Sequence, residues 1–293
     1  MMAPGPSFQP KNPLPDVETA LSPAAAAFDA VAAGFDARFG AWQSVAAQRA
    51  AVRSVVTEVV APGSHILELG GGTGEDAAWL TKHGYTVTVT DPSPSMVAVA
   101  TEKLSRTNST VEQLRAEDLK SWIEQRLPDD AQFDAVFSNF AGLNCVADLS
   151  SVAAGMARAL EPGAPALLVL FGPLPPGELA VQVLRGSRGA ALRRLQRGPV
   201  QARLQGRSFE IVYHRPRDVK LAFAPWFEFV RCRGIGVFVP PSAAEPWISD
   251  HPRLLRALAA MDRVATRPLA LLGDHVLYHF VRNSRNLSDA YER

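Results

Sequence analysis

Residues 65–76 read HILELGGGTGED, a short apolar run followed by a glycine-rich turn. The run Ile66–Leu69 has the length of a buried strand, and residues 75–83 form a predicted helix that ends at Gly84. Glycine adopts positive φ and allows a ligand to approach the backbone closely. Alternating glycines between a first strand and a helix therefore predict a loop that holds a nucleotide.

The spacing of these glycines argues against the two common phosphate-binding loops. Gly70, Gly72 and Gly74 alternate, whereas a dinucleotide fingerprint would place its third glycine at position 75, which is Glu75. The Gly-Lys-Ser/Thr sequence of a P-loop is missing as well. Glu75 and Asp76 suit a helix N-terminus but would repel a pyrophosphate bound there. The loop therefore favours a nucleoside without phosphates, including one that carries a positive centre.

Strand-like and helix-like segments alternate on both sides of this loop. The predicted strands are 66–69, 85–90, 111–114, 133–137, 166–171, 209–213, 227 to about 239, and 275–281. The predicted helices are 24–39, 42–60, 75–83, 94–105, 120–126, 149–160, 217–224 and 252–265, with two more short helices between residues 172 and 208. This rhythm predicts a parallel sheet with helices on both faces.

Several of these segments resemble, in order, the class I S-adenosylmethionine-dependent methyltransferases. The resemblance is carried by LELGGGTG, by Asp91 at the end of the second strand, by RAEDL, by FDAVFSNFAGLN and by ALEPGAPALLVLF. FDAVAAGFDARF near the N-terminus is similar to the capping helices of that family. The resemblance implies a doubly wound, mostly parallel seven-stranded sheet with an antiparallel last strand, a Rossmann-like methyltransferase fold.

The same resemblance implies a cofactor site for S-adenosylmethionine, with S-adenosylhomocysteine as the product. In that family the residue at Asp91 binds both ribose hydroxyls, for which a carboxylate is a suitable acceptor. Ala116 and Glu117 are expected near the adenine through their backbone. The full set of expected cofactor contacts is Glu68, Gly70, Gly72, Gly74, Asp91, Met96, Ala116, Glu117, Asn139 and Phe140.

We expect one methyltransferase domain over residues 21–293 after a disordered, proline-rich arm over residues 1–20. Its parts are a helical cap (21–62), a cofactor-binding core (63–172), a basic insertion (173–207) and a C-terminal part that completes the sheet and the acceptor side (208–293).

The methyl acceptor is expected to be a small or lipid-like metabolite methylated on oxygen or nitrogen. The Asn/Asp-Pro-Pro-Tyr sequence typical of adenine-N6 and glutamine methyltransferases is absent after the fourth strand, where Ser138 to Ala141 stand. Cys145 lacks the neighbouring proline of cytosine-C5 enzymes. His214 and His275 are the candidate general bases, because the pKa of histidine lies near neutrality.

Residues 173–220 contain nine arginines and one lysine against three acidic residues, so this segment carries a local charge of +7 on a chain of net charge +1. Such a surface suits an anionic acceptor, a carrier protein or a lipid headgroup. A methyltransferase acting on RNA or protein is one alternative, although aromatic residues are not interleaved with the arginines as in single-strand binders. A non-catalytic binding module and a nicotinamide-dependent oxidoreductase are the others.

The cysteine content and the apolar runs bear on metal binding, membrane insertion and secretion. The two cysteines, Cys145 and Cys232, form no zinc-site spacing, so no metal site is expected. No apolar run reaches the length of a membrane span, and the N-terminus lacks the pattern of a signal peptide. A cytoplasmic location is expected, and the oligomeric state is left open.

Overall fold

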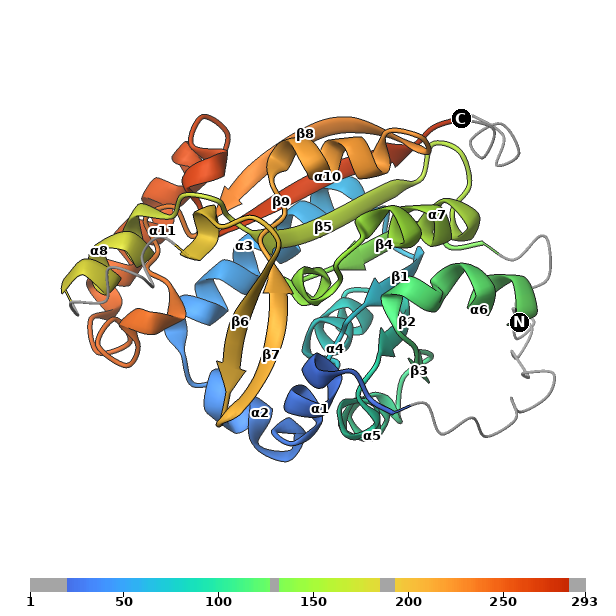
Figure 1. Ribbon diagram of the computed structural model, residues 1–293, viewed down its shortest axis with the longest axis horizontal. Helices are drawn as coiled ribbons and strands as arrows, with labels where there is room; N and C mark the ends of the chain where they lie inside the picture. Colours follow the sequence, from blue (N-terminus) through green and yellow to red (C-terminus); the bar gives the residue numbers. More distant parts are fainter. Residues whose placement is uncertain (1–19, 127–131, 185–192, 285–293) are drawn as a thin grey trace.

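The protein is built on a seven-stranded sheet with helices on both faces (Figure 1). A computed structural model describes residues 20–126, 132–184 and 193–284. The strands are β1 (His65–Leu69), β2 (Thr86–Asp91), β3 (Thr110–Gln113), β4 (Ala135–Ser138), β5 (Pro165–Phe171), β8 (Phe227–Ile235) and β9 (His275–Arg282). Their order is β3-β2-β1-β4-β5-β9-β8. β1 to β5 pair in parallel and β9 is antiparallel to β5 and β8, which confirms the predicted sheet.

Two layers of helices cover the sheet. One layer contains α3 (Gln43–Val59), α4 (Glu75–Lys82) and α5 (Pro94–Leu104), and the other contains α6 (Leu119–Arg126), α7 (Leu149–Ala159) and α10 (Pro216–Phe223). Successive strand residues point to opposite faces. Ile66 therefore packs with the first layer and Leu67 with the second, and both are fully buried. A sheet buried on both faces explains the uninterrupted apolar run of β5.

The N-terminal cap consists of two helices, α1 (Pro23–Asp29) and α2 (Ala32–Phe39), where the sequence predicted one helix over residues 24–39. Each helix is fixed to a different part of the core. The Asp29 carboxylate accepts a hydrogen bond from the Ser95 amide at the start of α5 (2.8 Å). The Asp36 carboxylate accepts one from the Thr73 hydroxyl of the glycine loop (2.6 Å). These two attachments favour a bend over a continuous helix.

A hairpin of β6 (Pro199–Leu204) and β7 (Arg207–Val212) forms a second, two-stranded sheet. Sequence patterns predicted a strand over 209–213 in the C-terminal part of the fold and none over β6. Gln205 and Gly206 join the strands with positive φ values of 46° and 83°, as a two-residue hairpin turn requires. β7 therefore pairs with β6 and not with the main sheet.

The other elements are α8 (Pro176–Leu184), α11 (Pro252–Ala265) and short 3-10 turns at Ala116–Asp118, Gly142–Cys145, Arg193–Leu195, Ser242–Ala244 and Ala270–Leu272. β8 ends at Ile235, earlier than the predicted end near Val239, because Gly236 turns the chain with a φ of 67°. The predicted disordered arm over residues 1–20, apart from Ala20, lies outside the described residues, as does the part of the insertion over residues 185–192.

Candidate active site

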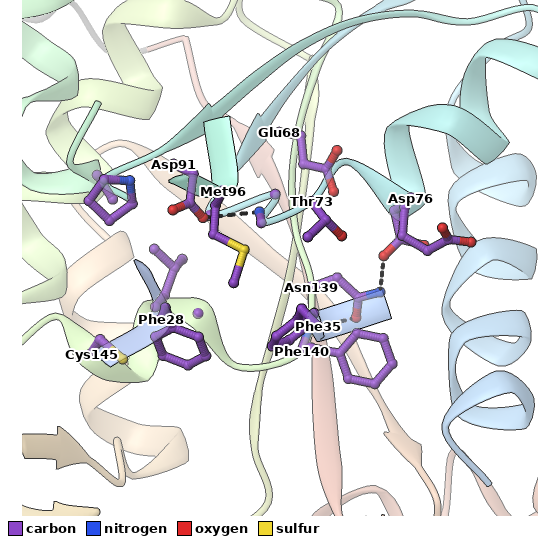
Figure 2. A pocket seen from close by; sticks show the side chains of 18 of the residues that line it. Phe28, Phe35, Glu68, Thr73, Asp76, Asp91, Met96, Asn139, Phe140 and Cys145 are labelled. Carbon is purple, nitrogen blue, oxygen red and sulfur yellow. Dashed lines mark hydrogen bonds between the residues drawn. The ribbon is translucent and has the colours of Figure 1, made fainter. Parts of the chain in front are cut away.

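A cavity of about 500 Å³ lies at the carboxyl ends of β1, β2 and β4 (Figure 2). Ligand sites of doubly wound sheets occupy this position, and the volume is typical of small-molecule sites. All predicted cofactor residues except Gly74 line the cavity, namely Glu68, Gly70, Gly72, Asp91, Met96, Ala116, Glu117, Asn139 and Phe140. The topology thus gathers residues that are widely separated in the sequence.

The glycine loop forms one wall of this cavity. Gly70 and Gly72 adopt positive φ values of 66° and 56°. A Cβ built on Gly72 would have no atom within 4 Å, so this backbone stands open for a ligand. Gly74 also has positive φ (74°), but a Cβ there would meet the Ala100 side chain at 3.2 Å. The structure therefore assigns Gly74 to the packing of α4 against α5 and not to the cavity wall.

Asp91 ends β2 and faces the glycine loop. Its carboxylate accepts hydrogen bonds from the amides of Gly72 (3.0 Å) and Ser93 (2.9 Å). Burial raises the pKa of Asp91 to about 6, and the nearby Asp29 carboxylate adds to this rise, while the two amides oppose it. The side chain is therefore mostly ionised at neutral pH and still has acceptor capacity for a donor in the cavity.

Glu68 is the second buried carboxyl group of the cavity. One of its carboxylate oxygens, Oε2, has no hydrogen-bond partner although the residue is only 2 % exposed. Burial raises the Glu68 pKa well above its usual value, and the charges of Asp76 and Asp91 add to the effect while Arg49 and Arg53 oppose it. An unpartnered buried carboxyl group that lines a cavity fits a ligand with a positive centre.

Asp76, at the start of α4, is held by two arginines of α3. Its carboxylate accepts hydrogen bonds from Arg49 (2.6 Å), Arg53 (2.7 Å) and the Asn139 side-chain amide (2.8 Å). The Arg49 guanidinium also lies 4.6 Å from the centre of the Phe140 ring. Sequence reasoning did not assign the two arginines to the site. Their four-residue spacing on a helix that also buries Val52, Val55 and Val56 was the available signal.

The loop after β4 contributes Asn139 and Phe140. The Asn139 side-chain oxygen accepts a hydrogen bond from the Phe140 amide (2.8 Å), which fixes the start of the turn. Phe140 and Ala141 have positive φ values of 48° and 60°. Non-glycine residues rarely adopt this conformation, and such strain concentrates at functional sites.

The cap supplies the aromatic side of the cavity. Phe28, Phe35 and Phe39 line it, and consecutive rings in this series contact one another at centroid distances of 6.4 and 4.6 Å. Phe28 packs in one apolar cluster with Met96 and in another with Cys145, and Figure 2 shows Phe28, Phe35 and Phe140 among the side chains that line the cavity. Burial raises the pKa of the Cys145 thiol to about 11, so this cysteine is a neutral wall of the cavity.

Neither predicted histidine lines the cavity. A ring nitrogen of His214 hydrogen-bonds to the Val146 carbonyl (2.9 Å). His275 is buried behind Phe140, stacks on Phe171 (5.2 Å between centroids) and has a Nδ1 atom 3.5 Å from the Asp274 carboxylate. Burial lowers the pKa of both histidines, so both are neutral at pH 7. Neither one is among the residues that line the cavity, and the role of either as general base stays a prediction.

The basic insertion is only partly a surface feature. Arg194 is buried, where it forms ion pairs with Glu178 and with Asp274 (2.7 Å) and donates to the Gly172 carbonyl (3.0 Å). Arg193 pairs with Glu178 as well (2.9 Å). These arginines fasten the insertion to the end of β5 and to the residue that precedes β9.

Within the described ranges, no helix has both the length and the apolar composition needed to cross a bilayer. No group of three or more His, Cys, Asp and Glu side chains in those ranges is arranged to hold a metal ion.

Residues 66–163 match the family model described as a methyltransferase domain. An S-adenosylmethionine-dependent methyltransferase from Mesorhizobium loti shares 22 % identity with a TM-score of 0.51, over 80 % of this chain and 98 % of that chain. The DhpI–SAH complex shares 20 % identity with a TM-score of 0.52, over 90 % and 97 %. The CcbJ methyltransferase from Streptomyces caelestis shares 15 % identity with a TM-score of 0.53, over 81 % and 90 %.

These solved structures share the fold, and no curated protein matches the chain. The family model covers the strands and loops that surround the cavity, from β1 to the turn before β5. Residues 66–163 are thus similar to a methyltransferase domain, and the chain shares the fold of solved S-adenosylmethionine-dependent methyltransferases.

Proposed function

We propose that this enzyme methylates an oxygen or nitrogen atom of a small or lipid-like metabolite. The observation that supports this proposal is the aromatic side of the cavity, where Phe28, Phe35 and Phe39 of the cap face the loop after β4. Small-molecule sites have this character, with mostly apolar walls and a few placed polar groups.

The residues of the opposite side fit the cofactor. We assign the ribose hydroxyls to the Asp91 carboxylate, which keeps acceptor capacity beyond its two backbone donors. The unpartnered oxygen of Glu68 suits the methionyl ammonium group. The open backbone of Gly70 and Gly72 accommodates the methionyl chain, and the Ala116–Glu117 backbone accommodates the adenine.

We assign the methionyl carboxylate to Arg49. Asp76 occupies one terminal nitrogen of its guanidinium group (2.6 Å), and the other donors are left for the cavity that Arg49 lines. Arg49 and Arg53 flank the Asp76 carboxylate beside the glycine loop, and the remaining guanidinium donors of Arg49 suit an anionic end of the ligand.

When bound, S-adenosylmethionine supplies an electrophilic methyl group on a sulfonium centre. The chain contributes alignment and exclusion of water. Asn139 and Phe140 form the wall between the cofactor side and the cap, and the strained turn at Phe140 is held by Asn139 and by the Arg49 guanidinium group. A site that holds two reactants in a fixed geometry lowers the entropy cost of bringing them together in the transition state.

The alternative of an RNA or protein acceptor has weaker support. It depends on the basic insertion, and Arg193 and Arg194 are engaged there in ion pairs with Glu178 and Asp274.

The proposal is tested with S-adenosylmethionine labelled on its methyl group. The purified enzyme is incubated with hydrophobic phenols, amines, fatty acids and isoprenoid alcohols, with total RNA, and with an acid-soluble protein extract. We expect label in an extractable small acceptor. Phe35→Ala should raise the KM for that acceptor, whereas Phe238→Ala, a half-buried phenylalanine that does not line the cavity, should leave it unchanged. Label that appears only in RNA or protein would overturn the proposal.

A further inference from the structure

The exposed apolar side chains of the described residues concentrate in one stretch of the chain. Five of the nine large apolar side chains with high exposure lie between residues 247 and 271, namely Trp247 (54 %), Leu254 (40 %), Met261 (48 %), Val264 (82 %) and Leu271 (41 %). Isolated exposed apolar residues are ordinary, whereas a concentration of them marks an interaction site.

Three of these side chains lie on one face of α11. Together with Ala257 they form a single row along the helix, because successive members are three, four and three positions apart: Leu254, Ala257, Met261 and Val264. All four are exposed. In Figure 1, α11 lies at the outer edge of the molecule near α3, which it contacts. The row therefore faces away from the sheet.

The opposite face of α11 is fixed to the protein. Leu255 is buried in a small apolar cluster with Val239 and Ile248. The buried Asp262 carboxylate accepts hydrogen bonds from the amides of Phe238 (2.6 Å) and Val239 (3.3 Å). α11 is thus a rigid element that presents its apolar row on a stable support.

The exposed charges next to this row are positive. Four exposed arginines lie in or directly after α11, namely Arg253, Arg256, Arg263 and Arg267. None of them forms an ion pair with a residue that the structure describes. The only acidic residue within α11 is Asp262, which is buried. Asp250, before the helix, is the exposed carboxylate of this stretch. We call Leu254, Met261 and Val264 together with Arg253, Arg256 and Arg263 the α11 surface.

We propose that the α11 surface docks on an anionic lipid bilayer. A helix that combines an apolar row with arginines lies in the plane of such an interface, with the apolar side chains among the acyl chains and the guanidinium groups on the phosphates. A second copy of the chain fits less well, because a symmetric contact would place arginines against arginines. Nucleic acid would leave the apolar row in water. This property is separate from the methyl-transfer proposal, and either one can fail alone.

The test is co-sedimentation of the full chain with vesicles of phosphatidylcholine alone and of phosphatidylcholine with one third phosphatidylserine. We expect binding only to the anionic vesicles, weakened by 0.5 M salt. Each arginine near such a surface contributes about fivefold in partitioning, so the Arg256→Ala/Arg263→Ala variant should bind about 25-fold more weakly. Met261→Asp/Val264→Asp should abolish binding by placing carboxylates in the apolar row.

Matched variants on another face control for charge and hydrophobicity. Arg215→Ala/Arg217→Ala makes the same change of charge near α10, and Leu221→Asp changes an apolar side chain that is 59 % exposed there. Both should bind vesicles as the wild type does. Unchanged thermal unfolding and unchanged S-adenosylmethionine affinity show that a variant is folded. No binding to either vesicle, equal loss in the control variants, or a dimer that Val264→Asp dissociates would overturn the proposal.

Discussion

The pKa of Asp91 provides a direct test of the cofactor site. Because burial raises this pKa to about 6, lowering the pH protonates Asp91 and removes the acceptor proposed for the ribose hydroxyls. With that pKa, about nine tenths of the carboxyl groups are ionised at pH 7 and about one tenth at pH 5. If only the ionised form binds well, the S-adenosylmethionine affinity should fall about tenfold between these pH values.

The perturbation that isolates this effect is Asp91→Asn. The asparagine keeps the size of the side chain but loses the charge-assisted character of two bonds to the ribose, a loss of about 2–3 kcal/mol. We expect the dissociation constant at pH 7 to rise about 30- to 150-fold. The part of the pH dependence between 5 and 7 that comes from Asp91 should then be lost, and only the part that comes from Glu68 should remain.

Isothermal titration calorimetry with S-adenosylmethionine at pH 5, 6 and 7 measures both expectations, and S-adenosylhomocysteine and NADH serve as comparison ligands. Asp218→Asn, which removes an exposed carboxylate on α10, is the matched control and should keep the wild-type profile. Thermal unfolding at pH 5 verifies that each protein is folded. An Asp91→Asn variant that keeps the tenfold change would refute the reasoning, since another group would then cause it. Preference for NADH would refute the cofactor assignment itself.

Three further predictions concern neighbouring residues. Because the Glu68 pKa is raised and an ammonium group would stabilise its carboxylate, wild-type binding should release protons, measured by calorimetry in buffers of different ionisation enthalpy. Glu68→Gln should reduce that release to the small part that comes from Asp91, and an unchanged release would contradict the role of Glu68. Asp76→Ala removes the ion-pair partner of Arg49 and leaves Arg53 with Glu75 alone, and it should lower the free energy of unfolding in urea by about 3–5 kcal/mol. A loss below about 1 kcal/mol would show that the arginines find other partners. Gly74→Ala should cost about 1–2 kcal/mol through its positive φ while cofactor affinity stays constant, and reduced affinity at full stability would place Gly74 in the site.

The sequence predicted those parts of the fold that depend on local pattern. The apolar runs of β1 and β5 and the glycine turn after β1 are continuous signals, so the sheet and most of the cavity wall followed from them. The N-terminal bend between α1 and α2 did not follow, because it depends on distant partners of Asp29 and Asp36. β6 was missed because its residues alternate between half-buried and exposed positions and carry few β-branched side chains.

The polar part of the site was harder to predict. Arg49 and Arg53 reach Asp76 across the space between two helices, and no local spacing connects residues 23 to 27 positions apart. The histidines were selected for their chemistry alone. Their surroundings in the fold have no local signal in the sequence: the His275 ring contacts Phe140, and His214 bonds to a backbone carbonyl.

The cap has a consequence for how this enzyme can diversify. Residues 23–39 supply three of the four phenylalanines that line the cavity, yet they precede the stretch over residues 66–163 that matches the methyltransferase domain. Under the proposed assignments, the acceptor contacts of the cap and most of the cofactor contacts are encoded in separate segments of the gene, joined by a few side-chain contacts such as Asp36 to Thr73. Exchange of the first segment between homologues that keep these contacts offers a route to altered acceptor range with an unchanged cofactor site.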